Sequence, residues 1–374
     1  MLYYFPLEPY KERYTVQLSA PITGWLESRW IEAGIEYHRV EGLSLNSEIK
    51  TGSVLDACGR GYWAQSQIMS FLELLNNGVI EENDVLYFDD FWHPGIESIK
   101  YAFEQVYSST VKFPKMYALL HAQSVDKYDF TFVMKDWMRH FEKGIGSCLN
   151  GIFVTSDILK ELVVAANIAP LLRVHNTGLP YNSNEVYTHF PPNLPKRNRL
   201  RVIYTSRWDW EKNPTFFLDV ARWLKEQSKD FEFVVTTSAK KIRSNNVYLL
   251  EKLRQAVNDG IVTLLEGLTK EQYYIELLKS GVQFNCAYQD WVSWTLLEAT
   301  TCGCTPVYPR FRSFPECFPS SLSDFLYTPN NVEEAAYKVI KAANFPACAS
   351  ELEQVFRPFD NSWKEMAKIM GVLK

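Results

Sequence analysis

A chain of 374 residues is longer than a single hydrophobic core usually supports, so two domains are expected. The composition, 47% hydrophobic and 22% charged, is that of a globular protein and excludes a disordered chain. The net charge of -5 gives no general attraction to nucleic acid or to an anionic membrane, so either partner would have to bind at a local basic patch.

The N-terminal segment, the hydropathy pattern and the cysteines predict a cytoplasmic protein without a membrane span. The opening residues, MLYYFPLEPYKERY, lack a basic stretch followed by an apolar one, and no 18 consecutive residues are apolar. The seven cysteines are an odd number and are scattered, which is typical of reduced thiols. Cys302 and Cys304 have no second pair and no nearby histidine, so we expect them to pack in the interior and not to bind zinc.

In the first half of the chain, short apolar segments alternate with amphipathic ones. An amphipathic helix is expected over about residues 16–34. Strands are expected at residues 2–7, 35–40, 84–90, 116–122 and 151–156. This alternation is typical of a parallel sheet flanked by helices.

The same rhythm restarts after residue 198 and predicts a second sheet. Strands are expected at residues 199–206, 231–238, 261–267, 282–287 and 305–309, with helices such as 214–227 and 270–280 between them. Residues 181–199, rich in Pro, Asn and charge, are expected to link the two halves.

We therefore predict an α/β fold with two Rossmann-like domains facing across a cleft. The expected domains are residues 1–195 and residues 196–345, followed by a helical segment, 346–374, for which packing back on the N-terminal domain is one arrangement. Parallel sheets bind ligands beyond the carboxyl ends of their strands, so the cleft is the expected site.

Two carboxylates flank the start of a helix predicted near residue 294. Segment 290–307 reads DWVSWTLLEATTCGCTPV, so seven residues separate Asp290 from Glu298. A carboxylate such as Glu298 accepts hydrogen bonds from two vicinal ribose hydroxyls, and the N–H groups at a helix start favour phosphate oxygens. The same residues also fit an ordinary helix cap followed by a solvent-facing glutamate.

This segment resembles the donor-binding signature of retaining glycosyltransferases of the GT-B type, in which two acidic residues are separated by seven positions. The resemblance implies a nucleotide-sugar donor, expected to be a UDP-sugar, whose ribose binds Glu298 and whose sugar binds Asp290. It implies donor contacts at Asp290, Trp291, Ser293, Trp294, Thr295 and Glu298. The first acid of the family is usually Glu, and residues 291–293 replace a glycine-containing tripeptide, so the sugar end is expected to be unusual.

Further donor contacts are expected in three strand-end loops. Segment 204–214, YTSRWDWEKNP, resembles the family's diphosphate-binding loop, which implies catalytic roles for Arg207 and Lys212. Two cations can neutralise the departing pyrophosphate, so no obligatory metal and no cofactor are expected; a solvated basic loop is the alternative. Two other strand ends resemble stretches that border the base, although their hydroxyls also suit helix caps. They contain Thr237, Ser238, Gly267 and Leu268.

His121 directly follows an apolar strand in the first half, where retaining GT-B enzymes commonly carry a histidine. The resemblance implies that His121 touches the donor sugar near its reacting carbon. A neutral imidazole would hydrogen-bond a sugar hydroxyl while the departing phosphate takes the acceptor proton, so no protein nucleophile is needed. A purely structural histidine is the alternative.

Two more segments of the first half are expected on the acceptor side. Segment 87–95, YFDDFWHPG, combines adjacent carboxylates with an imidazole, and we assign Asp90 a catalytic role; an Asp that caps a helix beginning at Pro94 is the alternative. The opening FPLEPYKERYT stands where this fold commonly has a glycine-rich loop, which indicates an unusual acceptor. The acceptor-side candidates are Glu8, Tyr10, Arg13, Asp89, Trp92 and His93.

Four segments together resemble glycosyltransferase-like proteins of large tailed phages: YYFPLEPYKERYT, YFDDFWHPG, LLHAQSVD and DWVSWTLLEA. Enzymes of that group place a sugar on hydroxymethylated pyrimidines in phage DNA, which implies a DNA acceptor and the host cytoplasm. The basic runs 196–201 and 240–243, with Arg310 and Arg312, are candidates for phosphate contacts, and Trp92 is a candidate for stacking on a flipped base. A saccharide or small-molecule acceptor, and a nucleotide-sugar-binding protein or epimerase without transferase activity, remain alternatives.

Overall fold

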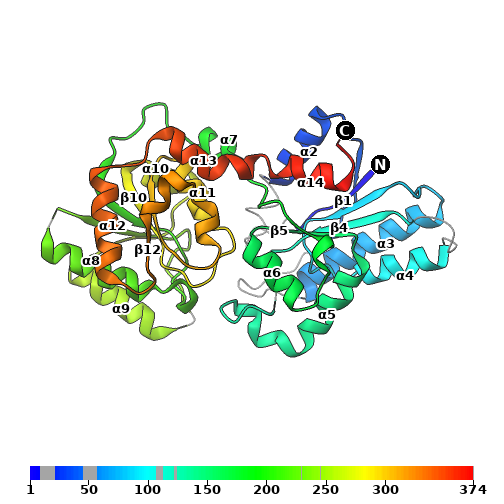
Figure 1. Cartoon of the computed structure of the whole chain (residues 1–374), viewed down its shortest axis with the longest axis horizontal. Helices are drawn as coiled ribbons and strands as arrows, with labels where there is room; N and C mark the ends of the chain where they lie inside the picture. Colours follow the sequence, from blue (N-terminus) through cyan, green and yellow to red (C-terminus); the bar gives the residue numbers. More distant parts are fainter. Residues whose placement is uncertain are drawn as a thin grey trace. The chain divides into compact units, whose positions relative to one another are not determined.

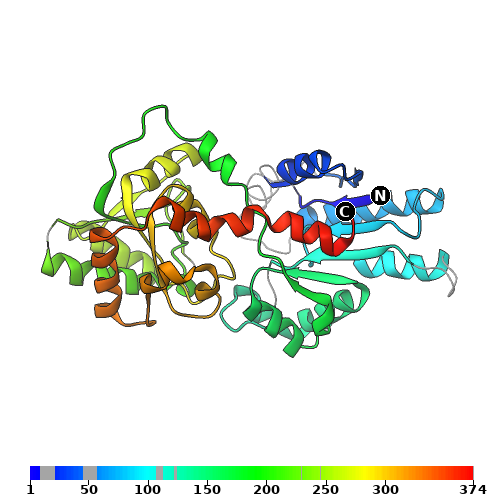
Figure 2. The same ribbon diagram turned by 45° about the horizontal axis from the view of Figure 1, so that its top comes forward.

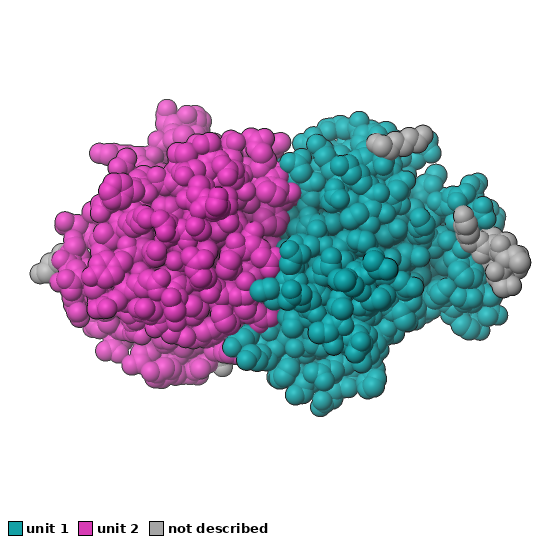
Figure 3. Space-filling model, in the orientation of Figure 1, with its two compact units in different colours: residues 1–182, 361–374 teal, residues 183–360 magenta. Residues whose placement is uncertain are grey.

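The computed structural model describes residues 1–8, 22–44, 57–106, 113–121, 124–228, 230–244 and 246–373. Two compact units are present, one formed by residues 1–182 with 361–374 and the other by residues 183–360 (Figure 3). Residues 183–195 and 346–360 therefore belong to the second unit, and the last residues of the chain belong to the first.

The first unit contains a parallel sheet in the order β2-β1-β3-β4-β5-β6, with helices around it (Figure 1). Its strands are β1 (Leu2–Phe5), β2 (Tyr37–Arg39), β3 (Val85–Phe88), β4 (Lys115–Leu119), β5 (Gly151–Val154) and β6 (Val174–Asn176). Its helices are α2 (Gly24–Glu32), η2 (Ala57–Gly61), α3 (Tyr62–Asn76), α4 (Ile96–Val106), η3 (Phe130–Met134), α5 (Lys135–Cys148), α6 (Asp157–Ala165), η4 (Leu171–Arg173) and α14 (Ser362–Met370). Strands β1, β3 and β5 are buried at every position, because helices cover both faces of a parallel sheet.

The C-terminal helix α14 returns to this unit. The Tyr117 hydroxyl on β4 donates to the Ile369 carbonyl at 3.4 Å. Both ribbon views place the two chain ends close together, with α14 near β1 (Figures 1 and 2).

The second unit contains a parallel sheet in the order β12-β11-β10-β7-β8-β9. Its strands are β7 (Asn198–Tyr204), β8 (Glu232–Thr236), β9 (Thr263–Leu265), β10 (Ser280–Phe284), β11 (Thr305–Pro309) and β12 (Leu326–Tyr327). Its helices are α7 (Ser183–Thr188), η5 (Trp210–Lys212), α8 (Pro214–Gln227), α9 (Val247–Asn258), α10 (Lys270–Lys279), α11 (Trp294–Thr301), η6 (Phe314–Cys317), η7 (Ser320–Phe325), α12 (Val332–Asn344) and α13 (Ala349–Asp360). The predicted class, α/β with two parallel sheets, is confirmed.

The segment expected to be a linker, residues 181–199, is packed into the second unit. It contains α7, which contacts α11 and α13, and the Ser183 amide and hydroxyl both donate to the Asp360 carboxylate, at 2.8 and 2.6 Å. Its Pro, Asn and charged residues favour a loop, but these contacts hold part of it as a helix.

Each sheet has one point where the chain reverses its direction of winding. In the first unit the chain passes from β1 to β2 on one side and returns to β3 on the other, and in the second unit it passes from β7 to β8 and returns to β10. Open parallel sheets bind ligands at such switch points, beyond the carboxyl ends of the two strands. The loops that follow β1 and β3, and those that follow β7 and β10, are therefore where a site is expected.

Candidate functional site

The switch point of the second unit brings together two donor-side residues that are far apart in the sequence. Lys212 follows β7 and Asp290 follows β10, and the Lys212 Nζ lies 2.8 Å from the Asp290 Oδ1. The Lys212 side chain is only 7% exposed and also donates to the Gln289 carbonyl. These two contacts hold the ammonium group in one position. The predicted cation and the first acid of the motif thus form one local site.

The loop that carries Lys212 is held by its own hydrogen bonds. The Tyr204 hydroxyl donates to the carbonyls of Arg207 and Lys212 at 3.3 and 3.2 Å. The loop ends at Asn213, whose φ of 50° is left-handed, and α8 begins at Pro214 as predicted. The position of Lys212 is therefore set before any ligand binds.

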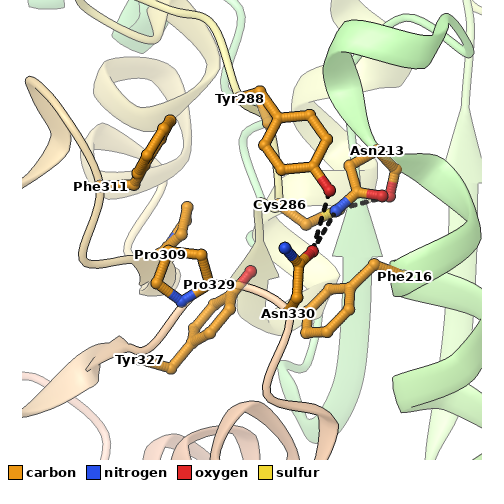
Figure 4. Close-up of a pocket in the computed structure, with 10 residues that line it drawn as sticks. Asn213, Phe216, Cys286, Tyr288, Pro309, Phe311, Tyr327, Pro329 and Asn330 are labelled. Carbon is orange, nitrogen blue, oxygen red and sulfur yellow. Dashed lines mark hydrogen bonds between the residues drawn. The ribbon is translucent and has the colours of Figure 1, made fainter.

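A polar cluster beside a very small cavity secures the end of this loop. Figure 4 shows the side chains of Asn213 and Tyr288 converging on Asn330. The Asn330 Oδ1 accepts from the Tyr288 hydroxyl at 2.9 Å and from the Asn213 Nδ2 at 3.1 Å. The cavity of about 10 Å³ is at the lower limit for one water molecule, and the hydrogen bonds of the cluster connect the loops that carry Asn213, Tyr288 and Asn330.

Arg207 lies in the same loop but faces solvent. Its side chain is 58% exposed, and its guanidinium contacts Glu211 at 2.6 Å and Asp209 at 3.6 Å. The Glu211 side chain is only 5% exposed, whereas the Arg207 side chain reaches into solvent. A doubly charged phosphate group can therefore approach Arg207 from the solvent side.

Glu298 lies on α11 with 3% of its surface exposed, which excludes the solvent-facing alternative. Its Oε1 accepts from the Tyr274 hydroxyl at 3.0 Å and from the Trp294 Nε1 at 3.2 Å, and it lies 2.5 Å from the Lys270 Nζ. Lys270 and Tyr274, both on α10, were not identified in the sequence. A lysine and a tyrosine in an amphipathic helix give no local signal, because their role depends on packing against α11.

The residues between the two acids support the loop in different ways. Ser293 is the N-cap residue of α11, although its hydroxyl bonds with the Tyr308 and Thr295 hydroxyls, at 3.3 and 3.1 Å, and makes no capping bond. Trp291 is 5% exposed, with the Arg312 guanidinium 4.5 Å from its ring centre. Arg312 was a candidate for phosphate contacts, but it lies against this indole.

The two stretches expected to border the base lie side by side. The Gly267 amide donates to the Ala239 carbonyl at 2.8 Å, and the Leu268 amide donates to the Thr237 carbonyl at 3.2 Å. Gly267 has a φ of 67°, a conformation that glycine adopts without strain. Ser238 is exposed. These four residues therefore line the carboxyl ends of β8 and β9 as one segment.

The switch point of the first unit contains a buried charged cluster. Arg60, in η2, pairs with Asp90 after β3 and lies 3.7 Å from the Glu8 carboxylate after β1. Arg60 is 6% exposed and Glu8 is 1% exposed. The Asp90 Oδ1 also accepts from the Trp92 amide at 2.8 Å, so this carboxylate is engaged on both oxygens. No local pattern identified Arg60 as a site residue. Tyr10 and Arg13 lie outside the described residues.

Asp89 and His121 form a second group at the same edge. The Tyr4 hydroxyl donates to the Asp89 carboxylate, and burial raises the pKa of Asp89 to about 6. The His121 Nε2 donates to the Asp89 carbonyl at 2.6 Å. Burial lowers the pKa of His121 to about 4, so its ring is neutral at pH 7 and its Nδ1 is left as a hydrogen-bond acceptor.

We expect NMR spectra of the imidazole nitrogens to find His121 neutral at pH 7, with the proton on Nε2, and titrating near pH 4. The unfolded chain binds this proton near pH 6.5, so the contribution of His121 to stability is lost as the pH falls from about 6.5 towards 4. Titration near pH 6.5, or a proton on Nδ1, would contradict this assignment.

His93 and Trp92 point into the first unit. The His93 Nε2 donates to the Gln67 Oε1 at 3.0 Å, and burial lowers the pKa of His93 to about 3. Trp92 is 3% exposed, and its indole donates to the Glu142 carboxylate at 3.2 Å. Both side chains are buried, at 7% exposed for His93 and 3% for Trp92, so the Trp92 ring is covered and not presented for stacking on a base.

The basic runs named as phosphate contacts have different roles. In the run 196–201, Arg197 donates to the carbonyls of Ser280, Cys302 and Gly303 at 2.6 to 2.8 Å, and Arg201 pairs with Glu276. These two arginines hold strands and helices of the second unit together. Lys240, Lys241 and Arg243 are exposed.

Across the residues that the structure describes, no group of three or more His, Cys, Asp or Glu side chains is arranged to hold a metal ion. None of the helices within those residues is long and apolar enough to cross a bilayer.

Comparisons with known proteins agree with this architecture. No family model matches the chain. The tRNA-queuosine alpha-mannosyltransferase of Drosophila melanogaster is 29% identical over 134 residues, which are 35% of this chain and 33% of that protein. The match thus spans about a third of that curated relative.

Three solved structures resemble the chain more broadly. Sucrose-phosphate synthase from Thermosynechococcus elongatus has a TM-score of 0.64 at 14% identity, and the match covers 99% of this chain and 97% of the synthase chain. The trehalose-6-phosphate synthase OtsA has a TM-score of 0.63 at 10% identity, and the match covers 99% of this chain and 98% of the OtsA chain. The pneumococcal O-GlcNAc transferase GtfA, in complex with UDP and GlcNAc, has a TM-score of 0.56 at 11% identity, covering 83% and 60%. At these identities the likeness concerns the fold, and the chain has the GT-B fold.

Proposed function

We propose that this protein is a glycosyltransferase that moves a sugar from a nucleotide-sugar donor, a UDP-sugar, to an acceptor hydroxyl with retention of configuration. The observation that carries the proposal is the donor half, in which the buried Lys212 ammonium pairs with the partly exposed Asp290 at the switch point and the Glu298 carboxylate of the same motif is buried. The GT-B fold and the names of the similar proteins, which are glycosyl-transferring enzymes, support it.

In the proposed reaction, the bond between the sugar carbon and the diphosphate breaks, and the acceptor oxygen bonds to that carbon on the same face. The departing phosphate takes the acceptor proton, and the nucleoside diphosphate leaves. Lys212 and Arg207 stabilise the charge that develops on the diphosphate, so no metal ion is required. Glu298 binds the ribose, and the neutral His121 accepts a hydrogen bond from a sugar hydroxyl through Nδ1.

The acceptor we propose is a base in nucleic acid, and first of all a hydroxymethylated pyrimidine in DNA. The resemblance to phage glycosyltransferase-like proteins supports this choice. A tRNA base is the second candidate, because the curated relative is named for tRNA-queuosine.

Sugar transfer can be tested directly by incubating the protein with UDP-sugars and hydroxymethylated DNA, unmodified DNA or tRNA. We expect mass spectrometry of the digested nucleosides to find a hexose or pentose on the hydroxymethylated pyrimidine only when donor and protein are both present. Sugar on tRNA alone would select the second candidate. Binding of UDP without turnover for any donor and acceptor pair would overturn the transferase proposal.

A further inference from the structure

An exposed basic and aromatic surface lies on η3 and α5 in the first unit. We call it the α5 patch and define it by the exposed Val133, Trp137, Arg139, His140 and Lys143, together with the half-buried Lys135. Val133 is 86% exposed and Trp137 is 53% exposed, so an aliphatic and an aromatic side chain lie among these basic residues. Neither the donor site nor the acceptor-side cluster uses these residues.

The patch is positively charged, although the protein as a whole has a negative net charge. Lys135, Arg139 and Lys143 carry three positive charges, and Asp136 is the one exposed carboxylate between residues 130 and 143, whereas the whole chain has a net charge of -5. The opposite face of α5 is buried through Met138, Glu142, Ile145 and Gly146. The solvent-facing side of α5 is therefore a local site for an anionic partner.

The patch begins at the same edge of the sheet as His121 and continues along α5. Helix α5 follows β4 and leads to the parallel strand β5, so η3 and the start of α5 lie towards the carboxyl ends of the strands. Glu142 strengthens this connection: it accepts from the Ser124 amide at 2.7 Å and hydroxyl at 2.8 Å, and from the Trp92 indole at 3.2 Å. Ser124 lies three residues after His121, and Trp92 lies two residues after Asp90. Helix α5 is thus tied directly to both acceptor-side loops.

We propose that the α5 patch binds the nucleic-acid strand on either side of the acceptor base. Arg139, Lys143 and Lys135 contact phosphates, and Trp137 stacks on a neighbouring unpaired base. The inference rests on the proposed function, since a macromolecular acceptor must extend beyond the reacting hydroxyl. An anionic membrane also attracts basic residues. The patch, however, has only two exposed apolar side chains to insert into a bilayer, so its chemistry favours nucleic acid.

The test compares R139E/K143E and W137A with the wild type in binding a fluorescent hydroxymethylcytosine oligonucleotide, single-stranded and duplex. We expect R139E/K143E to lower the affinity at least tenfold and to reduce the slope of log affinity against log salt by about 2, measured from about 50 to 200 mM salt. W137A should weaken binding roughly 5- to 100-fold. Thermal melting checks folding, and R139Q/K143Q replaces the double reversal if that variant melts early.

Two matched controls change the same charge elsewhere. K252E/R254E, on α9 of the second unit, should bind the oligonucleotide as the wild type does. K240E/K241E tests the other exposed basic run. Loss of binding in K240E/K241E with normal binding in R139E/K143E would overturn the proposal, as would binding to vesicles of anionic phospholipid but not to oligonucleotide.

UDP binding and transfer to free hydroxymethylcytidine separate this proposal from the proposed function. Both should be unchanged in R139E/K143E, whereas the KM for the oligonucleotide rises at an unchanged kcat. If the wild-type protein binds UDP but modifies only the free nucleoside, the proposed role of the α5 patch is wrong and the proposed transferase function stands. If the wild-type protein binds no nucleotide and transfers no sugar, both proposals are wrong.

Discussion

Glu298→Ala is expected to weaken UDP binding by at least about 100-fold. Two charge-assisted hydrogen bonds to the ribose hydroxyls contribute about 1.5 to 3 kcal/mol each, and both are lost with the carboxylate. The wild-type protein should also discriminate against 2′-deoxy-UDP, and the variant should lose most of this discrimination. Isothermal titration calorimetry with the two nucleotides measures both effects.

The packing around Glu298 requires a stability control. Its removal leaves the Tyr274 hydroxyl and the Trp294 indole without this acceptor, so the variant is also expected to melt at a lower temperature. Glu276→Gln, on α10, is a matched control, because it breaks the ion pairs with Arg201 and Lys279 in the same unit, away from the motif. It should lower stability and leave UDP affinity unchanged. Unchanged UDP affinity in a folded Glu298→Ala variant would refute the ribose assignment.

Lys212→Met is expected to lower the single-turnover rate at saturating donor by roughly 100- to 1000-fold. The ammonium group is placed to stabilise charge on the departing diphosphate, and loss of one such preorganised group typically has an effect of this size. The Lys212 Nζ is 2.8 Å from Asp290, so methionine also leaves this carboxylate without its cation. Rapid quench with radiolabelled UDP-sugar measures the rate separately from product release.

Two further variants show whether the effect belongs to this position. Arg222→Met, on α8, removes an exposed ion pair with Asp219 and should transfer sugar at the wild-type rate. Arg207→Met should reduce the rate with a smaller loss of melting temperature than Lys212→Met, because the Arg207 side chain is 58% exposed and that of Lys212 is 7% exposed. A folded Lys212→Met variant with the wild-type rate would exclude a role at the diphosphate.

Local patterns account for most of the elements. The apolar run at residues 84–90 contains β3, and the proline at position 214 begins α8, because burial of alternating or continuous apolar residues and the restricted φ of proline act over a few residues. The spacing of Asp290 and Glu298 was visible for the same reason: both lie in one short segment around one helix start.

Long-range partners were not visible in this way. Lys270 lies 28 residues before Glu298, and Arg60 lies 30 residues before Asp90. A surface lysine and a buried ion-paired arginine look alike in a sequence, since only packing decides which carboxylate each one meets. The same holds for Arg197, whose position in a basic run suggested a phosphate contact but whose guanidinium binds three backbone carbonyls.

The residue order alone was sufficient for the α/β class, for the two sheets and for the list of chemically suitable side chains, because each depends on local hydrophobicity and spacing. Which of those side chains are buried, paired or exposed depends on strand order. The reversals between β1 and β3 and between β7 and β10 place Lys212 beside Asp290 and Arg60 between Glu8 and Asp90. In the folded protein Trp92 is buried and Trp137 is exposed. The reason is the orientation of α5, whose buried face carries Glu142, the partner of the Trp92 indole, and whose solvent-facing side carries Trp137.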